Sequence, residues 1–468
     1  MLNFFLCFMQ SKNLTFYTSL NASQNAKCTI DSPCSYKSVI LKAKQFDHVI
    51  FNDTYILQNL DLLEFQFTVN TLIQKSVKIS GSDEITIING TFLKPKTDYF
   101  IISREGCKTF YFSNFEFTGF KHPVMVVNGV EAANMINVTF KKNMLDNNFC
   151  IALWTVSALN ISNVIFSENA VNYTEVLFIT TSIIMGNNFV FERNYGEHLG
   201  HDSLLRILNG YFLVDNVTIR DNSANDAPLS YVDCRTGILF TNLTLERNYH
   251  PELFLCDGKC NFSFVDCVIK GNRGVILETT GQAYAELVNT SIINNFSPDE
   301  PLFYLPSGVF GFENDSMIIG NHGKSFLEMS EENSQIYIIN STFESNSWDT
   351  YAFGCGYNGN ITIRNTSVHS DFSKFSTFNV ESGLIDLDNF TSIYNYNSLI
   401  NITSGNLTVL NSKFTDEKEI ELSFNENVTY IGVNNTFAGI FYEEESYISK
   451  NLSKILHEQK ETPISTEL

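Results

Sequence analysis

The sequence predicts an all-β protein: a single parallel β-helix of about fourteen coils, with short capping helices at both ends. Three observations predict it: a repeated motif, an alternation of apolar residues within the motif, and an alternation of charge between copies. The motif Asn-x-Thr/Ser-apolar-x-x-Asn returns at intervals of roughly 22–28 residues, which is the range of solenoid repeats. Clear copies open at Asn137, Asn163, Asn188, Asn216, Asn242, Asp266, Asn289, Asp315, Asn340, Asn365 and Asn389.

Within each motif the side chains alternate between apolar and polar. Val138 and Phe140 are expected on one face, and Asn137 and Thr139 on the other. A period of two is the signature of a strand with one buried face. Further short apolar runs follow each motif, so two or three strands make one coil. This pattern favours a parallel β-helix over a leucine-rich repeat or a propeller, whose periods and consensus residues differ.

The charges at one motif position alternate in sign along the chain. The column reads Lys142, Glu168, Arg193, Asp221, Arg247, and the neighbouring column reads Glu192, Arg220, Glu246, Lys270. Coils stacked in register would hold each of these side chains ~4.8 Å from an opposite charge above and below. The alternation therefore predicts the register of stacking.

The asparagines that close the motif are expected to be structural. Asn tolerates left-handed backbone angles at a corner, and stacked amides hydrogen-bond to one another along the axis. The column contains Asn143, Asn169, Asn194, Asn222, Asn248, Asn272, Asn295, Asn321 and Asn346.

The ends of the stack need caps, because an open end exposes unpaired strand edges and core. We expect an N-terminal cap over residues 12–46, with a short helix after the Cys28–Cys34 loop, and the β-helix over 47–442. Residues 443–468 form the predicted C-terminal cap or tail. Helical spacing of apolar residues there predicts a helix, with Ile448, Leu452, Ile455 and Leu456 on one side.

The first residues predict export. Residues 1–11 are a short apolar run followed by a small polar residue, which we interpret as a secretory signal. No later stretch approaches the ~18 apolar residues of a transmembrane helix. The net charge of −21 disfavours nucleic acid as a partner, because an acidic surface repels phosphates.

Many motifs are also Asn-x-Ser/Thr sequons. Asn137, Asn216, Asn242 and Asn340 are the glycosylation candidates, because the alternation places them on the outer face. A repeat rich in Asn and Thr also generates sequons by itself.

The cysteines allow two disulfides. Cys28 and Cys34 flank a tight loop, and Cys234 and Cys260 occupy the same place in consecutive coils. The alternative is a zinc site in which Cys256 and Cys267 join Cys234 and Cys260, although the spacing departs from usual zinc pairs. No cofactor is expected.

The Phe-x-x-Asn endings of the motifs, such as those at 140–143, 166–169, 191–194 and 343–346, resemble the repeats of polymorphic outer membrane proteins. That family belongs to the pectin-lyase-like right-handed β-helix group. The resemblance implies that the predicted parallel β-helix is right-handed, and it implies surface exposure and adhesion. The companion Gly-Gly-Ala-Ile tetrapeptide and a membrane-barrel domain are missing from this sequence, which favours a free secreted form or a relative from a eukaryotic microbe over an outer-membrane autotransporter.

The leading functional hypothesis is a secreted or cell-surface β-helix that binds an extracellular protein or glycan without catalysis. The alternative is a polysaccharide lyase or hydrolase of the pectin-lyase-like group, and a third is a spacer or coat component. One loop holds acid–base or metal-ligand residue types, Glu197, His198, His201 and Asp202, but its spacing matches no common site, so a solvated loop is the favoured interpretation.

Overall fold

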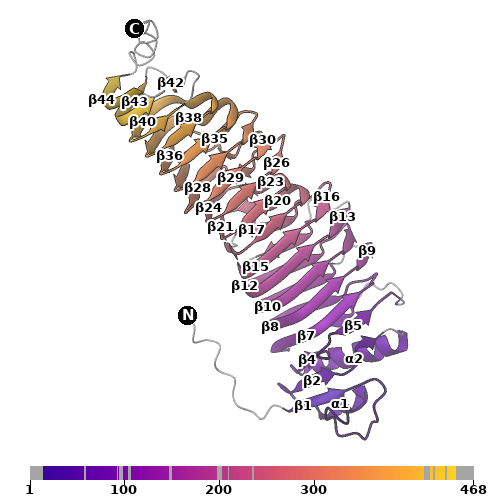
Figure 1. Cartoon of the computed structure of the whole chain (residues 1–468). Coiled ribbons are helices and arrows are strands. Elements are labelled where there is room, and N and C mark those ends of the chain that lie inside the picture. Colours follow the sequence, from indigo (N-terminus) through magenta and orange to yellow (C-terminus); the bar gives the residue numbers. More distant parts are fainter. Residues whose placement is uncertain are drawn as a thin grey trace, which may run out of the picture. The chain divides into compact units, whose positions relative to one another are not determined.

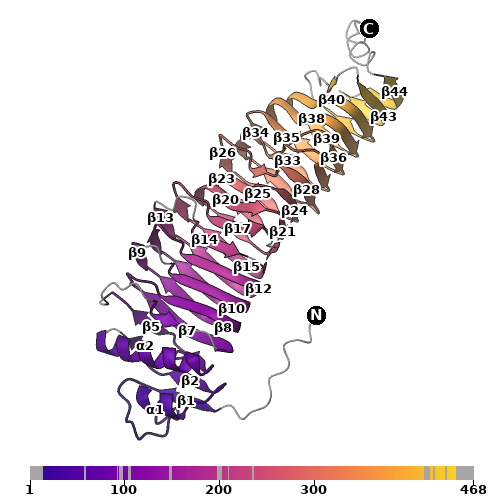
Figure 2. The same cartoon turned by 180° about the vertical axis from the view of Figure 1, so that it is seen from behind.

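The computed structural model describes residues 14–448 apart from 57–58, 92, 94–98, 104–106, 147–149, 198–202, 209, 235–236, 416–421, 425–426 and 438–439. The chain forms two compact units, residues 1–230 and 231–468. Both are stacks of parallel strands, and together they contain about 13 turns (Figures 1 and 2). The predicted parallel β-helix is therefore confirmed.

The predicted N-terminal helix is present. Strand β1 (Thr15–Thr18) pairs in parallel with β2 (His48–Phe51), and helix α1 (Tyr36–Lys42) lies between them in sequence. The Ser35 hydroxyl caps α1 by accepting a hydrogen bond from the backbone N–H of Ser38, which satisfies a group that a helix leaves open at its N-terminus. Tyr36 is buried against the ring of Phe51.

A second helix inside the first coils was not predicted. Helix α2 (Asn59–Gln74) follows β3 (Tyr55–Ile56) and precedes β4 (Lys78–Ser80). Its buried residues Leu62, Phe65, Val69 and Leu72 recur at spacings of three and four, which is the helical period. That period was the signal for a helix that the sequence offered. Helix α2 contradicts the predicted uninterrupted run of β-coils over 47–442.

The remaining strands repeat the same coil. In unit 1 they are β5 (Thr86–Asn89), β6 (Ile101–Ile102), β7 (Thr109–Thr118), β8 (Met125–Lys141), β9 (Met144–Asp146), β10 (Ala152–Ser167), β11 (Ala170–Asn172), β12 (Leu177–Glu192), β13 (Tyr195–Glu197), β14 (Leu205–Leu208), β15 (Tyr211–Arg220) and β16 (Ser223–Ala224). Strand β17 (Ser230–Cys234) starts at the boundary between the units.

Unit 2 continues the pattern with shorter strands. They are β18 (Gly237–Thr241), β19 (Thr244–Glu246), β20 (Tyr249–Gly258), β21 (Cys260–Val265), β22 (Val268–Lys270), β23 (Arg273–Thr279), β24 (Gln282–Val288), β25 (Ser291–Ile293), β26 (Phe296–Ser297), β27 (Phe303–Tyr304), β28 (Ser307–Glu313), β29 (Met317–Ile319), β30 (His322–Gly323), β31 (Leu327–Met329), β32 (Gln335–Ile339), β33 (Thr342–Glu344), β34 (Ser347–Trp348), β35 (Tyr351–Cys355), β36 (Gly359–Arg364), β37 (Ser367–His369), β38 (Phe372–Asp388), β39 (Thr391–Ile393), β40 (Tyr396–Leu410), β41 (Lys413–Phe414), β42 (Leu422–Phe424), β43 (Val428–Phe437) and β44 (Ile440–Ile448).

Equivalent residues lie directly over one another. Phe140 pairs with Phe166, which pairs with Phe191 in the next coil. The rings of Phe140 and Phe166 are stacked with centroids 4.6 Å apart. Such stacking fills the core, because each apolar side chain packs on its equivalent in the next coil.

Two left-handed residues bend each coil. One is the motif-opening residue, as at Asn137 (φ 54°), and the other immediately precedes the closing Asn, as at Lys142 (φ 53°) and Glu168 (φ 56°). The prediction that the closing asparagines occupy the left-handed corners was wrong. They follow the corner and point inward, which explains why all nine are buried.

The predicted amide ladder of the closing asparagines is present. Asn169 donates from Nδ2 to Asn194 Oδ1 (2.9 Å) and to Phe140 O (2.9 Å), and its own Oδ1 accepts from Asn143. The same bonds recur at Asn272, Asn295 and Asn321 in unit 2. Buried amides whose hydrogen bonds are all satisfied have a structural role, because they hold neighbouring coils together.

The charge column confirms the predicted register in unit 1. Lys142 Nζ and Arg193 Nη2 both lie 3.6 Å from the carboxylate of Glu168. In the neighbouring column, Arg220 Nη2 lies 2.7 Å from Glu192 Oε2. These partly exposed pairs each contribute only ~0.2–1 kcal/mol, so their effect is chiefly on register.

The C-terminal end differs from the prediction. Strand β44 pairs antiparallel with β43, which turns the chain back over the last coil. Ile448, expected to begin a helix, is the last residue of β44. The rest of the predicted cap helix lies outside the described residues, as does the predicted signal over 1–11.

Candidate functional site

The loop singled out in the sequence is largely outside the described residues. Glu197 ends strand β13, is exposed, and pairs in register with Asn172 of the preceding coil. His198, His201 and Asp202 fall in the undescribed segment 198–202, so their candidate role remains a prediction.

A different cluster of titratable groups lies in unit 2. The cluster consists of four glutamates, and we call this surface the carboxylate face. They are Glu252 on β20, Glu278 on β23, Glu300 in the connection between β26 and β27, and Glu328 on β31. Glu278 and Glu328 belong to one outward column, because Glu278 pairs with Tyr304 and Tyr304 pairs with Glu328. Stacking thus gathers carboxylates that the sequence separates by whole coils.

Two glutamates of the carboxylate face, Glu252 and Glu278, have raised pKa values. Burial, together with the charges of Glu278 and Glu300, raises the pKa of Glu252 to about 7. Burial and the charge of Glu300 also raise the pKa of Glu278. Removal of a carboxylate from water, and the repulsion between like charges, both favour the neutral acid.

A lysine and a tyrosine complete the carboxylate face. Lys324 Nζ lies 3.6 Å from Glu300 Oε2 and 3.5 Å from Glu328 Oε2. The Tyr351 hydroxyl hydrogen-bonds to Glu328, and burial together with that carboxylate raises the pKa of the tyrosine. Gly354 makes room for this ring, because a Cβ there would lie 2.3 Å from Tyr351 Cε2.

This arrangement can hold one acid protonated beside others that are ionised, which is the requirement for acid–base chemistry. The four carboxyl groups outnumber the ammonium group of Lys324, so the surface suits a neutral or cationic ligand better than an anionic one. Ion-pair networks without catalytic function shift pKa values in the same way.

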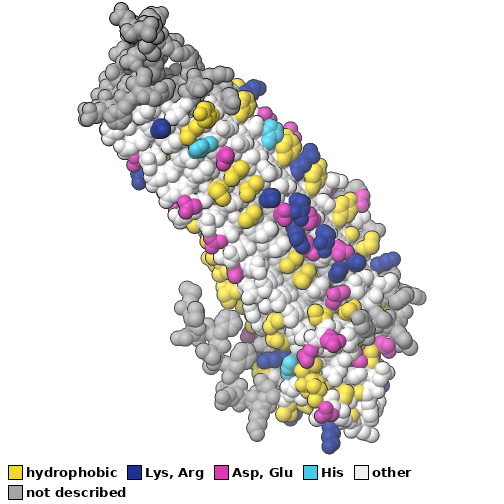
Figure 3. All heavy atoms as spheres, viewed as in Figure 1, with side chains coloured by type: hydrophobic (Ala, Val, Ile, Leu, Met, Phe, Trp, Pro, Cys, Tyr) yellow, Lys and Arg dark blue, Asp and Glu magenta, His cyan; other side chains and the backbone are white. Residues whose placement is uncertain are grey.

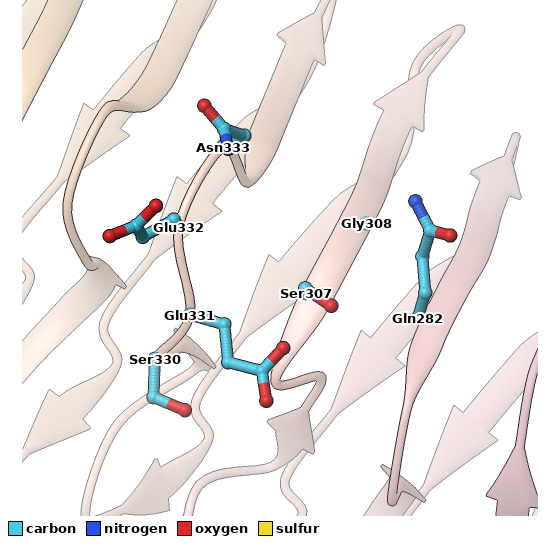
Figure 4. Close-up of a pocket in the computed structure, with 7 residues that line it drawn as sticks. All are labelled: Gln282, Ser307, Gly308, Ser330, Glu331, Glu332 and Asn333. Carbon is cyan, nitrogen blue, oxygen red and sulfur yellow. The ribbon is translucent and has the colours of Figure 1, made fainter.

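A polar hollow of about 490 Å³ lies beside the carboxylate face (Figure 4). Tyr304 connects the two, since its hydroxyl lies 3.3 Å from Ser330 Oγ. The Glu331 carboxylate points toward Ser307, whereas Glu332 points away. The lining residues are Gln282, Ser307, Gly308, Ser330, Glu331, Glu332 and Asn333.

A column of rings and cations follows the buried amide ladder of unit 2. Arg273 lies over Tyr249 (5.1 Å) and Phe296 (5.4 Å), and the Phe296 ring stacks on His322 (5.2 Å). Each neighbour covers the face of the next group, so these contacts mainly stabilise the stack.

Three aromatic residues farther along are exposed to solvent. Phe372 is 41% exposed, and Phe375 and Tyr394 are each 60% exposed. They lie on two successive coils, and we call them the aromatic patch. On the face drawn in Figure 3, hydrophobic side chains emerge in groups beside charged side chains of both signs.

The cysteines differ in part from the prediction. Cys28 and Cys34 form the expected disulfide. Cys260 bonds to Cys256 in place of Cys234, because the short turn between β20 and β21 brings Cys256 and Cys260 together within one coil. That bond also removes two ligands from the zinc alternative. In the described part of the chain, no three His, Cys, Asp or Glu side chains are arranged to hold a metal ion.

The sequon asparagines form a second, outer amide ladder. Asn137 donates to Asn114 Oδ1 (3.0 Å), and Asn216 donates to Asn188. Asn340 is exposed and accepts from Asn365 (3.0 Å), and Asn242 occupies the same left-handed corner. Glycosylation of these four remains a prediction. Among the described helices, none is long and apolar enough to cross a membrane.

No protein-family model matches this sequence, and no curated protein matches it. The resemblance to polymorphic outer membrane protein repeats therefore remains a prediction. The solved structures that share a likeness with the chain include two lyases and an epimerase. Pectate lyase Pel9A is 11% identical, with a TM-score of 0.30, over 77% of this chain and 80% of that one.

The other two likenesses are of the same low level. The A-module of mannuronan C-5 epimerase AlgE4 from Azotobacter vinelandii is 10% identical, with a TM-score of 0.30, over 80% of this chain and 96% of that one. The PL6-family alginate lyase AlyGC is 8% identical, with a TM-score of 0.21, over 91% and 89%. Likenesses this low carry no argument about activity.

Proposed function

We propose that this protein is a secreted or surface-displayed β-helix that binds an extracellular protein or glycan. The aromatic patch of Phe372, Phe375 and Tyr394 is the observation that carries the proposal. Exposed aromatic side chains lose the hydrophobic stabilisation of a core, and aromatic residues are enriched at the energetic centres of interfaces. Their position on rigid coils would present them to a partner with little entropic cost.

The test is binding of the labelled full chain to intact cells and to extracellular matrix. The variant Phe372→Ser/Phe375→Ser/Tyr394→Asn is expected to bind at least about tenfold more weakly, since loss of a hot spot costs ~2 kcal/mol or more. Asn at 394 suits the left-handed backbone there (φ 54°). The matched control is Tyr173→Asn/Tyr211→Ser in unit 1, which also removes exposed tyrosines, one of them left-handed (φ 64°). Equal binding by both variants would remove the patch from the proposal, and no binding by the unmodified chain would end it.

The carboxylate face favours a second candidate, a hydrolase of neutral glycans. Glycoside hydrolysis uses one carboxylic acid to protonate the leaving group and a second carboxylate as base or nucleophile. Glu252, with its pKa raised to about 7, would be the acid, and the ionised group would come from Glu278 or Glu328.

The expected result for this candidate is release of reducing ends from a neutral polysaccharide. The rate should fall as the pH rises through about 7, because Glu252 then loses the proton that it donates. Glu252→Gln should lower the rate about 100-fold or more, while Glu331→Gln in the neighbouring hollow should leave it unchanged. No activity on neutral and acidic polysaccharides would leave binding as the function.

A further inference from the structure

We call each residue of the buried amide ladder a rung, and one rung is an aspartic acid in place of an asparagine. Asp371 occupies the position that is Asn at 295, 321, 346 and 395, and its side chain is only 2% exposed. A carboxyl group resembles the amide in shape, but once ionised it has no hydrogen to donate.

The hydrogen bonds that Asp371 accepts match those of the other rungs. Asn346 donates to Asp371 Oδ1 from its backbone N–H (2.8 Å) and from Nδ2 (3.0 Å), and Nδ2 also lies 3.3 Å from Oδ2. The backbone N–H of Asp371 in turn donates to Asn395 Oδ1 (2.8 Å). Asp371 is therefore seated in the ladder as an asparagine would be.

The bonds that the other rungs donate cannot be made by a carboxylate. Each ladder Asn donates from Nδ2 to a backbone carbonyl of the preceding coil, as Asn346 does to Ile318 O (2.9 Å) and Asn395 does to Val368 O (3.0 Å). In both cases the accepting carbonyl belongs to the residue three positions before the ladder residue of the preceding coil. The ladder residue that precedes Asp371 is Asn346, so the equivalent carbonyl for Asp371 is that of Phe343. Only the protonated acid has an O–H that could replace this bond.

The charges around Asp371 also favour the neutral form. Burial and, to a smaller extent, the carboxylate of Glu344 on β33 raise its pKa to about 7, against the lowering effect of the hydrogen bonds from Asn346. His369 on β37 is in register with Glu344 on the outward side. Tyr394 precedes the next rung, and Lys374 follows on β38.

We propose that Asp371 is a pH-sensitive joint in unit 2: protonation completes the ladder between the coils of Asn346 and Asn395, and ionisation opens it. The sign follows from the raised pKa. Below about pH 4 the carboxyl is protonated in the folded and the unfolded chain, so the full stability is present. As the pH rises through 7 the folded chain must ionise a buried group, and the stability of these coils falls. The joint lies next to Phe372, so neutral or alkaline pH would loosen the aromatic patch.

The test is amide hydrogen exchange of the full chain at pH 5.5 and pH 8.5, corrected for the intrinsic pH dependence of exchange. Peptides covering 340–400 should lose protection by about tenfold or more at the higher pH, relative to peptides from unit 1. Asp371→Asn should abolish this difference and remain protected at both pH values. Asn fits the rung sterically and restores the missing donor, so this variant is expected to fold at least as well as the natural chain.

A reciprocal variant locates the effect. Asn321→Asp should create a new loss of protection at pH 8.5 in peptides covering 295–346. Persistence of the natural pH difference in Asp371→Asn would overturn the proposal. So would a loss of protection spread evenly over both units. If Asn321→Asp does not fold, the comparison of Asp371→Asn with the natural chain decides alone.

Discussion

Alanine in place of Gly308 is expected to lower the free energy of unfolding of unit 2 by about 3 kcal/mol or more. Gly308 has a φ of 122°, and a Cβ there would lie 1.9 Å from the backbone oxygen of Ala283 in the preceding coil. Neither atom can move alone, because β28 is hydrogen-bonded to β24 on one side and to β32 on the other. The chain must therefore break its stacking register at this corner.

The matched control is Gly311→Ala in the same strand. Gly311 is not left-handed, and a Cβ added there would have Glu286 Cγ as its nearest neighbour at 3.9 Å, an ordinary contact. This change should be neutral or stabilise by ~0.4–1 kcal/mol, because alanine restricts the unfolded chain. Urea unfolding followed by fluorescence measures both, since the two tryptophans, Trp154 and Trp348, are buried in different units. In a Trp154→Phe background only unit 2 is observed, and similar midpoints for the two glycine variants would contradict the close approach.

Alanine in place of Asn295 is expected to destabilise unit 2 by about 3 kcal/mol or more, because several buried groups lose their partners at once. Asn295 donates to Ile269 O (2.9 Å) and Asn321 Oδ1 (3.0 Å), and it accepts from the backbone and side chain of Asn272. Water cannot replace these bonds easily, since the side chain is only 1% exposed.

The outer amide ladder supplies the control for this change. Asn365 makes the same kind of amide contact, to Asn340 Oδ1 (3.0 Å), but in solvent. Glycine at this position accepts the φ of 49°, so Asn365→Gly should cost less than about 1 kcal/mol. Protein made in a bacterial host avoids the loss of a sequon as a second variable. If Asn295→Ala and Asn365→Gly lowered the free energy of unfolding equally, burial would not be the reason that the inner ladder stabilises the protein.

The candidate site could not be predicted in the same way as the fold. The loop around Glu197 stands out in the sequence because its residue types are neighbours there, whereas Glu252, Glu278, Glu300 and Glu328 are separated by roughly one coil each. Glu278 and Glu328 share an outward column, which the pattern of strands predicts once the register is known. Glu252 is in register with Val275 and Glu300 lies between strands, so only the tertiary structure shows their approach to this column and the burial that raises the pKa of Glu252.

The repeat pattern also did not predict two features of the fold, helix α2 and the disulfide partner of Cys260. Helix α2 precedes the first clear copy of the motif, so the repeat says nothing about it, although its apolar residues have a helical period. The partner of Cys260 was expected from stacking between coils, and the structure instead forms a bond across a turn within one coil. Local geometry decided that pairing, since Cys256 lies only four residues away.

The sequence alone determined the parallel coils, their register and both asparagine columns. It could do so because identical residues recur at each coil, and stacking places every residue beside its own equivalent, as with Glu168 between Lys142 and Arg193. Only the tertiary structure decided which asparagines face the core, which carboxylates share a surface, and that Asp371 is buried among amides. Those properties depend on exclusion of water by neighbouring coils, which a repeat pattern does not record.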